Sequence, residues 1–241
     1  MKSLLSLFDY SGTWSEPYER GGWNVYRWDI KIDELMDVNF IDTAETALDL
    51  FEDIDGIIAA VPCTDFSVSG AQYWPKKDQS GQTAAALELV YQVQRLADLF
   101  TPTDPDFEGS FFWSMENPVG RINRLCPDLE KPYYFNPCDF AGYLNLSASD
   151  HNELDRIRRK DGFNVNREEI DFVIQCEAYT KKTGLWGDFN RKLEKDPIEP
   201  VRVCRQGSPV QTFGGKSDKT KEARSITPVG FSKAFYYANN E

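Results

Sequence analysis

Short apolar runs alternate along the chain with segments in which apolar residues recur every three or four positions. Such apolar runs are typical of strands that are buried on both faces of a sheet, and strands are predicted at 3–9, 23–30, 38–41, 57–61 and 110–115, of which 57–61 is the most continuously apolar. The periodic segments predict helices at 43–51, 83–100, 168–179 and 229–239. This alternation of strands and helices predicts an α/β fold with a mostly parallel, doubly wound sheet.

The apolar run from Ile57 to Val61 ends abruptly at Pro62-Cys63. Proline has no N–H to donate to a strand ladder, so the chain is expected to leave the sheet there. Ligands bind at the carboxyl edge of open α/β sheets. Cys63 is therefore a candidate nucleophile, and the polar segment behind it is a candidate lid with Ser67, Ser69, Gly70 and Gln72. The alternative is that Cys63 is a small buried apolar residue.

A second buried run, 110–115, leads into Glu116-Asn117-Pro118. A parallel sheet would bring this triplet to the same edge as Cys63. A carboxyl group at such an edge can have a raised pKa and act as a proton donor. The alternative role for Glu116 is a helix cap or a loop hydrogen bond.

The front of the chain has the order strand, glycine turn, short helix, strand and acid. Ser11-Gly12 makes the turn, Thr13-x-x-Glu16 fits a capping box, and Gly21-Gly22 would end the helix. The second strand finishes at Asp29. This order is typical of a nucleotide-binding βαβ unit, in which the acid accepts hydrogen bonds from ribose hydroxyls. An ordinary α/β connection is the alternative.

The net charge of −12 is unevenly distributed. From His151 onward the chain carries 17 Lys and Arg and 14 Asp and Glu, a balance of +3, whereas the first 150 residues carry 10 and 25, a balance of −15. Phosphate binding depends on lysine and arginine. Any polyanion is therefore expected to face the second half, where Arg156, Arg158, Arg159 and Lys160 form a basic cluster.

Composition limits the classes of protein that fit. The 241 residues are 41% hydrophobic, enough for one folded domain with an insertion. No apolar stretch is long enough to span a membrane, and the start MKSLLSLFDYSG is too short in its apolar part for a signal peptide. The five cysteines, Cys63, Cys126, Cys138, Cys176 and Cys204, suit neither a disulfide framework nor a zinc site. We expect a cytoplasmic protein without metal.

The carboxyl-terminal half is harder to read from its pattern. Residues 147–167 are polar, 181–187 resemble a loop entering or leaving a strand, and 207–227 are rich in Gly, Ser, Lys and Thr and are expected to be flexible. We predict a core at 1–141, an inserted recognition region at 142–181, and a segment at 182–241 that completes the core.

The candidate residues together resemble one family. Phe8 with Ser11-Gly12-Thr13, Asp29, Asp42, Pro62-Cys63-x-x-Phe66-Ser67-x-Ser69-Gly70-x-Gln72 and Glu116-Asn117-Pro118 occur in the order of DNA cytosine-5 methyltransferases. Later pieces, Lys181 to Trp186 and Gly214 to Pro228, are similar to the carboxyl-terminal segments of compact, phage-type members. The resemblance is weak between Asn145 and Tyr179.

The resemblance implies a Rossmann-like methyltransferase fold that uses S-adenosyl-L-methionine to methylate C5 of a cytosine flipped out of DNA. By this mapping Cys63 adds to C6 of the base, Glu116 hydrogen-bonds or protonates N3, and Asn117 and Pro118 shape the pocket. Ser67, Ser69 and Gln72 would close over the base. The implied cofactor residues are Phe8, Ser11, Gly12, Thr13, Asp29, Ile30, Asp42 and Pro62, with Asp29 on the ribose and Asp42 near the adenine. A phage-encoded member would act in the host cytoplasm.

Two features depart from the family pattern. Trp14 stands where related turns have a second glycine, and no Gln-x-Arg-x-Arg segment is found, so Lys181 or Lys182 is the nearest substitute. Two alternatives therefore stay open. One is a methyltransferase-fold protein that serves as an acidic binding or decoy protein or as a protein partner of an active enzyme. The other is related chemistry on a free pyrimidine nucleotide.

Overall fold

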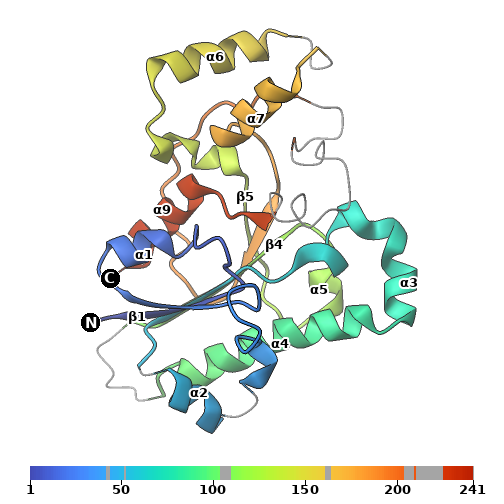
Figure 1. Ribbon diagram of the computed structural model, residues 1–241, viewed down its shortest axis with the longest axis vertical. Coiled ribbons are helices and arrows are strands. Elements are labelled where there is room, and N and C mark those ends of the chain that lie inside the picture. The colour runs from blue at the N-terminus through green and yellow to red at the C-terminus, as the bar shows by residue number, and fades with distance from the viewer. Residues whose placement is uncertain are drawn as a thin grey trace. The chain divides into compact units, whose positions relative to one another are not determined.

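The computed structural model describes residues 1–41, 44–51, 53–103, 110–160, 164–203, 209 and 225–240 (Figure 1). Its contacts divide the chain into two compact units. Unit 1 comprises Met1–Tyr134, Thr183–Arg191 and Asn239–Glu241, and unit 2 comprises Phe135–Lys182 and Lys192–Ala238. The domain boundaries expected from the sequence stay a prediction.

A six-stranded sheet organises unit 1. Its order is β2-β1-β3-β4-β6-β5, with β1 at Ser3–Leu7, β2 at Asn24–Trp28, β3 at Gly56–Ala59, β4 at Phe112–Pro118, β5 at Tyr133–Phe135 and β6 at Thr183–Trp186. The first four strands pair in parallel, whereas β6 is antiparallel to β4. This mixed, mostly parallel sheet confirms the predicted α/β class and is consistent with a Rossmann-like methyltransferase fold.

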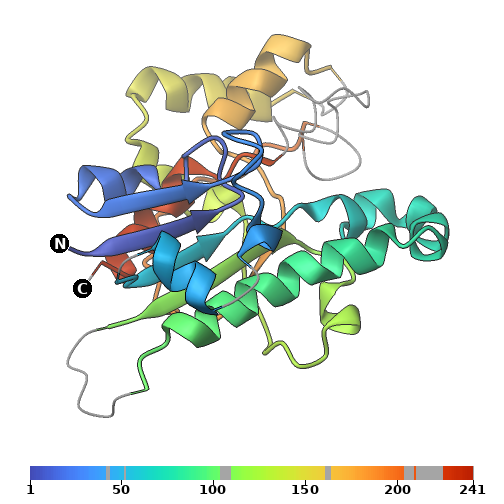
Figure 2. The same cartoon turned by 60° about the horizontal axis from the view of Figure 1, so that its bottom comes forward.

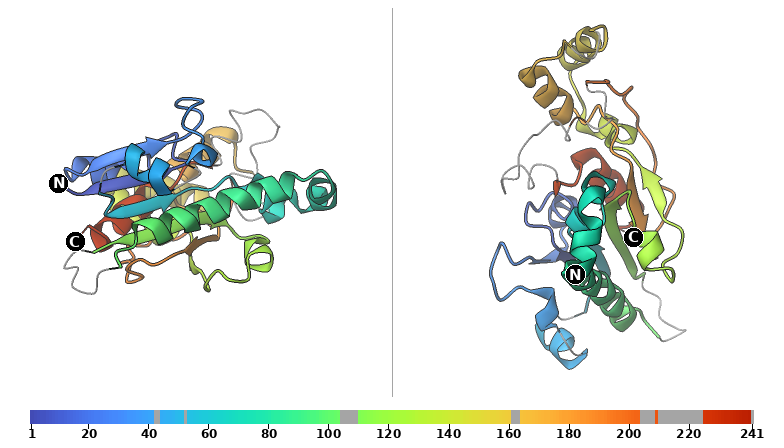
Figure 3. Two further views of the ribbon diagram at one scale, coloured as in Figure 1. Left: turned by 90° about the horizontal axis from the view of Figure 1, so that it is seen from below. Right: turned by 90° about the vertical axis from the view of Figure 1, so that its right-hand side faces the viewer.

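Helices cover both faces of this sheet. Helices α2 (Ala44–Leu50) and α4 (Gln82–Phe100) lie on one face, and α1 (Glu16–Arg20) lies on the other (Figure 2). The apolar stripe of α4 is buried at Ala86, Val90, Val93 and Leu96, as its helical spacing predicts. Helix α3 (Trp74–Gln79) and the first turn of α4 project beyond the carboxyl edge of the parallel strands (Figure 3). A four-residue helix, α5 (Ile122–Leu125), follows β4.

The predicted strand at 38–41 is wrong. Val38–Phe40 is a 3-10 helix, η1, because the Asp37 side chain accepts a hydrogen bond from the Asn39 N–H and closes a turn. The carbonyl groups of Val38 and Ile41 accept hydrogen bonds from Gln92 of α4 instead of from a neighbouring strand. The Gln92 side chain thus occupies the carbonyl groups that a neighbouring strand would otherwise bind.

The predicted capping box at Thr13 is also wrong. Helix α1 begins at Glu16, and the Thr13 hydroxyl lies 3.1 Å from the Ser11 hydroxyl. Helix α1 has no side-chain cap hydrogen bond, and the N–H of its N-cap residue Ser15 donates to Asp9 at 3.1 Å. The glycine stop is confirmed: Gly21 follows the helix and Gly22 has φ of 84°.

Two elements differ in extent from the prediction. Strand β4 continues through Glu116, Asn117 and Pro118 instead of ending before them. The expected loop at 181–187 contains strand β6, which pairs with this extension of β4. Because β6 supplies an antiparallel neighbour, Glu116, Asn117 and Pro118 stay in the sheet, and Pro118 is the last residue of the strand.

Unit 2 is built mainly from α6 (Ala148–Arg158), α7 (Arg167–Gln175) and α9 (Val229–Ala238), together with 3-10 helices at Pro137–Asp139 and Ala141–Leu144. Capping boxes begin α6 at Ser147 and α7 at Asn166. Phe231 of α9 stacks on Phe135 at 4.1 Å between ring centroids. The two helices predicted at 168–179 and 229–239 are confirmed with slightly shorter bounds. Most of the predicted flexible segment 207–227 lies outside the described residues.

Candidate functional site

Cys63 directly follows the point where β3 leaves the sheet. Ala60 still donates its N–H to the Leu7 carbonyl, after which Pro62 directs the chain into the 3-10 turn η2, Cys63–Asp65. Cys63 is half-buried, whereas Cys126, Cys138 and Cys176 are buried. Burial raises the pKa of the Cys138 and Cys176 thiols to about 11. Among the cysteines that the structure describes, Cys63 is thus the most accessible to a substrate; Cys204 lies outside that part of the chain.

Glu116 and Asn117 lie on β4, the strand beside β3. The parallel register pairs Ala59 with Met115, so Glu116 is the next residue along the same edge. Asn117 is fully buried, and its Nδ2 donates to the Val61 carbonyl at 2.8 Å. This bond ties β4 to the residue before Pro62. Glu116 is 6% exposed and pairs with Leu185 of β6.

The chain beyond Cys63 and the chain beyond Pro118 run side by side. Ser67 forms an antiparallel bridge with Gly120, and the Arg121 N–H donates to the Phe66 carbonyl at 3.0 Å. A Cβ atom at Gly120 would lie 1.9 Å from that carbonyl oxygen, so only glycine permits this approach. The structure therefore brings the segments that carry Cys63 and Glu116 to one edge of one sheet.

Strained backbone marks the turn after β1. Phe8 has φ of 59°, a conformation unfavourable for a bulky residue, and its N–H donates to the Trp28 carbonyl at 3.0 Å. Gly12 has φ of 71° and donates to the Asp9 carbonyl. Such strain is concentrated at functional sites in proteins. Phe8 and Gly12, both predicted from the sequence, form the backbone of this turn.

Asp9, absent from the predicted set, organises the same turn. It is 3% exposed and accepts hydrogen bonds from the Ser6 hydroxyl and the Ser15 N–H. Burial raises the pKa of Asp9, although these hydrogen bonds oppose the shift. The predicted cofactor residues Ser11 and Thr13 are engaged in the turn itself, with Ser11 Oγ donating to Asp9 at 3.3 Å. The sequence feature that could have identified Asp9 is an acid close behind the buried strand β1.

Asp29 and Ile30 follow β2, the strand next to β1. Asp29 is 8% exposed and accepts the Lys31 N–H through Oδ1 at 2.8 Å, while its Oδ2 has no hydrogen-bond donor among the described residues. Ile30 is 59% exposed. A carboxylate oxygen still able to accept, beside an exposed apolar side chain and a strained glycine turn, fits the ribose and ring of a nucleoside cofactor. Asp42 lies outside the described residues.

The predicted substrate residues lie on three different parts of the chain. Ser69 and Gln72 are exposed on the 3-10 segment Val68–Tyr73, and the Ser67 and Ser69 hydroxyls lie 3.0 Å apart. Pro118 pairs with Thr183. Lys181 and Lys182 belong to unit 2 and directly precede Thr183 in the chain. The exposed face of Pro62 completes the predicted set at the end of β3.

The predicted basic cluster in unit 2 is largely paired within the protein. Arg156 and Lys160 both contact Glu169, at 2.6 and 2.5 Å, and Arg158 pairs with Asp155. These contacts lower the pKa of Glu169 to about 2, with the Lys160 hydrogen bond as the largest cause. Arg159 is exposed and has no ion pair in the part of the chain that the structure describes.

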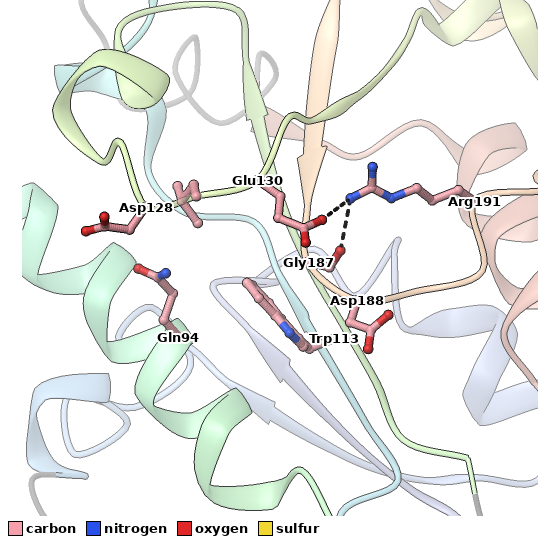
Figure 4. Close-up of a pocket in the computed structure, with 8 residues that line it drawn as sticks. Gln94, Trp113, Asp128, Glu130, Gly187, Asp188 and Arg191 are labelled. Carbon is pink, nitrogen blue, oxygen red and sulfur yellow. Dashed lines mark hydrogen bonds and ion pairs between the residues drawn. The ribbon is translucent and has the colours of Figure 1, made fainter.

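A cavity of about 340 Å³ lies toward the other end of β4 (Figure 4). Trp113, Gln94 and Leu129 line it together with the charged side chains of Asp128, Glu130, Asp188 and Arg191. Arg191 pairs with Glu130 at 3.3 Å, and Trp113 donates its N–H to the Asp188 carbonyl. The predicted site residues do not line this cavity.

The described residues offer neither a membrane-spanning helix nor a metal site. No described helix combines the length and apolar character that a membrane span requires. Groups of three or more His, Cys, Asp or Glu that could hold a metal ion do not occur in the described ranges.

Residues 4–103 match the model of the family described as C-5 cytosine-specific DNA methylase. No match was found among curated proteins. The matched segment is similar to this family, includes Cys63 and the glycine turn, and ends before Glu116. The match does not distinguish a phage-type member, which stays a prediction.

Proposed function

We propose that this protein transfers a methyl group from S-adenosyl-L-methionine to C5 of a cytosine in DNA, with Cys63 as the nucleophile. The observation that carries the proposal is the pairing of two chain segments at one sheet edge. Cys63 leaves β3 and Glu116 lies on β4, and Asn117 joins the two through its 2.8 Å bond to Val61. The family match to residues 4–103 supports the same chemistry.

The residues at this edge have distinct roles in the proposal. The Cys63 thiolate forms a bond to C6 of the cytosine ring, which raises the electron density at C5. Glu116 donates a hydrogen bond or a proton to N3 and so stabilises the charge that enters the ring. Once C5 is methylated, loss of its proton to water restores the C5–C6 double bond and expels the Cys63 thiolate, and N3 returns its proton.

The cofactor would be held at the ends of β1 and β2. Phe8 and Gly12 shape the turn, Asp29 would accept from ribose hydroxyls through Oδ2, and Ile30 would cover the adenine; Ser11, Thr13, Asp42 and Pro62 complete the proposed set. S-adenosyl-L-methionine, when bound, supplies an electrophilic methyl group. Ser67, Ser69, Gln72, Pro118 and either Lys181 or Lys182 are proposed to contact the flipped base or its strand.

Trapping on DNA that contains 5-fluorocytosine tests the nucleophile. Because fluorine at C5 prevents the final elimination, the native chain should form a covalent adduct that survives denaturing electrophoresis, and Cys63→Ser should form none. Cys126→Ala removes a buried thiol of the same unit and should leave the adduct intact. An adduct of undiminished yield with Cys63→Ser would remove Cys63 from this role.

A second function is favoured by the paired basic cluster. Because Arg156, Arg158 and Lys160 contact carboxylates of unit 2, few of these charges are available to phosphates. A methyltransferase-fold protein that binds a protein partner would have this property. Titration calorimetry with S-adenosyl-L-methionine separates the two functions: saturable heat supports methyl transfer, and its absence up to millimolar cofactor supports the binding role.

A further inference from the structure

Arg121 is a buried cation whose side chain bonds to several distant parts of unit 1. It is 3% exposed and directly follows the turn after β4. Its Nε donates to the Asp65 carbonyl at 2.9 Å, Nη1 donates to Asp78 Oδ2 at 3.0 Å, and Nη2 donates to the Thr83 hydroxyl at 2.7 Å. The guanidinium also lies 4.8 Å from the centre of the Trp74 ring.

These partners lie at the two ends of the segment that contains the predicted lid. Asp65 is at its start, two residues after Cys63, whereas Asp78 and Thr83 are at its end, where α3 gives way to α4. Thr83 also donates to Asp78 at 2.6 Å, and this bond, with Arg121, holds the pKa of Asp78 below its ordinary value. One guanidinium therefore closes the whole segment 65–83 into a loop.

Arg121 also connects this loop to the strand that carries Glu116. Its backbone N–H donates to the Phe66 carbonyl, and the neighbouring Gly120 pairs with Ser67. Lys77 adds an independent tie, with Nζ donating to the Thr64 carbonyl at 2.7 Å and pairing with Asp65 at 3.0 Å. The carbonyl groups of the turn that begins at Cys63 are thus held by cations from two other elements.

We propose that Arg121 is a positioning residue that clamps both ends of segment 65–83, the Cys63 loop. The clamp thereby fixes the position of the Cys63 thiol relative to Glu116. The exposed stretch between the clamped ends, which includes Val68 and Tyr73, is then the part of the loop that moves during closure. All residues of the clamp belong to unit 1. Its effect on catalysis rests on the proposed methyl transfer.

The side-chain chemistry explains why arginine occupies this position. A guanidinium presents five N–H donors in a rigid plane, so it can serve three acceptors that lie in different directions. A lysine has the same charge but a single donor centre, and it would reach only one or two of these acceptors. Arg121→Lys therefore keeps the charge and removes the clamp.

Hydrogen exchange and thiol alkylation test the clamp without any assumption about the reaction. In Arg121→Lys, exchange should rise in peptides covering 63–83 and stay unchanged in those covering β1 and β3. Alkylation of Cys63 by iodoacetamide, followed by peptide mass, should become faster. Arg124→Lys changes an exposed arginine of α5, the short helix that directly follows Arg121, and should alter neither. Unchanged exchange at 63–83, or a rise throughout unit 1, would overturn the proposal.

Kinetics test the catalytic consequence. Arg121→Lys should lower kcat for methyl transfer by about 10- to 100-fold, because misplacing a reacting group by about 1 Å costs up to that amount, while KM for DNA and for the cofactor stays within about 2-fold. A rise in KM at unchanged kcat would overturn the positioning role. If the native chain methylates nothing, the proposed function fails, and the exchange result still decides the clamp.

Asp78→Asn provides a second variant if Arg121→Lys does not fold. The amide keeps the size of Asp78 and an acceptor for Thr83 or Arg121, but it removes the ion pair. We expect a smaller increase in exchange, concentrated at 74–83 and not at Cys63. Equal protection of the native chain and Asp78→Asn throughout 63–83 would overturn the proposal.

Discussion

Two polar regions of the molecule, the Cys63 edge in unit 1 and the basic cluster in unit 2, use their polar side chains in opposite ways. At the Cys63 edge, where β3 leaves the sheet, Asn117 and Arg121 donate hydrogen bonds to backbone carbonyl groups on either side of a half-buried thiol. In the basic cluster, Arg156 and Lys160 contact Glu169. In the first region polar side chains bind the backbone around a candidate nucleophile, whereas in the second they form ion pairs with one another.

The difference shows which sequence features report on function. Cys63 follows the buried strand β3 and Glu116 lies near the carboxyl end of β4, and a parallel sheet brings the ends of such strands together whatever the intervening loops do. A run of arginines has no such constraint, since each side chain pairs with whichever acid the tertiary fold places beside it. Motif order was therefore more informative here than local charge.

Removing the acid of the Cys63 edge should have the largest effect. Because Glu116 is proposed to assist proton transfer at N3, Glu116→Gln should lower kcat for methyl transfer by about 10² to 10⁴-fold with little change in KM. Single-turnover methylation of a cytosine-containing duplex measures this. Glu130→Gln, in the cavity at the other end of β4, is the control and should be neutral. Equal losses in the two variants would contradict the assignment of Glu116.

A second comparison concerns two buried acids of unit 2. Glu169 is paired with cations, whereas Glu177 is buried against the start of α9, where it accepts the N–H groups of Val229 and Gly230. Burial raises the pKa of Glu177 to about 7, although these hydrogen bonds and Lys233 oppose the shift. The folded state therefore binds this proton more tightly than the unfolded state, whose glutamate titrates near 4.5.

Stability should accordingly fall as pH rises through about 7. The contribution of Glu177 is fully present below pH 4.5, and up to about 3 kcal/mol of it is lost by pH 8. Denaturant unfolding between pH 4 and 8 measures this, and Glu177→Gln should remove that part of the slope. The exposed Glu168→Gln should retain it. If the free energy of unfolding of Glu177→Gln depends on pH as it does in the native chain, another group is responsible for the titration.

The cofactor end of unit 1 should respond more modestly. Asp29→Ala removes the acceptor proposed for the ribose and should weaken S-adenosyl-L-methionine binding by about 1 to 3 kcal/mol, the usual cost of unpaired buried hydroxyls. Titration calorimetry gives the affinity. Asp33→Ala removes a nearby acid whose carboxylate accepts the Leu35 N–H in a local turn. This variant should bind the cofactor with the affinity of the native chain. Unchanged affinity in Asp29→Ala would contradict its role.

The smallest effects are expected in the basic cluster. Arg156→Gln should change DNA affinity by less than about 2-fold, since its charge is already neutralised by Glu153 and Glu169. Arg159→Gln removes an exposed charge and, where it contacts a phosphate, should reduce the salt slope of binding by about 0.9. Fluorescence anisotropy at several salt concentrations measures both. A larger loss for Arg156 would reverse the comparison of the two regions.

Several features could be predicted from the sequence because they depend on local rules. The predicted strands include the four that pair in parallel, β1 to β4, and Pro62 and Gly22 marked the ends of a strand and a helix. Other features depended on distant partners. The run 38–41 forms a turn because Gln92 binds its carbonyl groups, and β6 became a strand because the extension of β4 supplies its neighbour.

The parallel strands β1 to β4 and the glycine turn were predicted from the sequence alone, because burial and proline or glycine chemistry act within a few residues. The same local rules selected Cys63 and Glu116 as candidates. Only the tertiary structure decided that Arg121 joins the two ends of the Cys63 loop and that Arg156 faces Glu169. Each of these contacts joins side chains to groups whose direction is set by packing, and packing is a property of the whole fold.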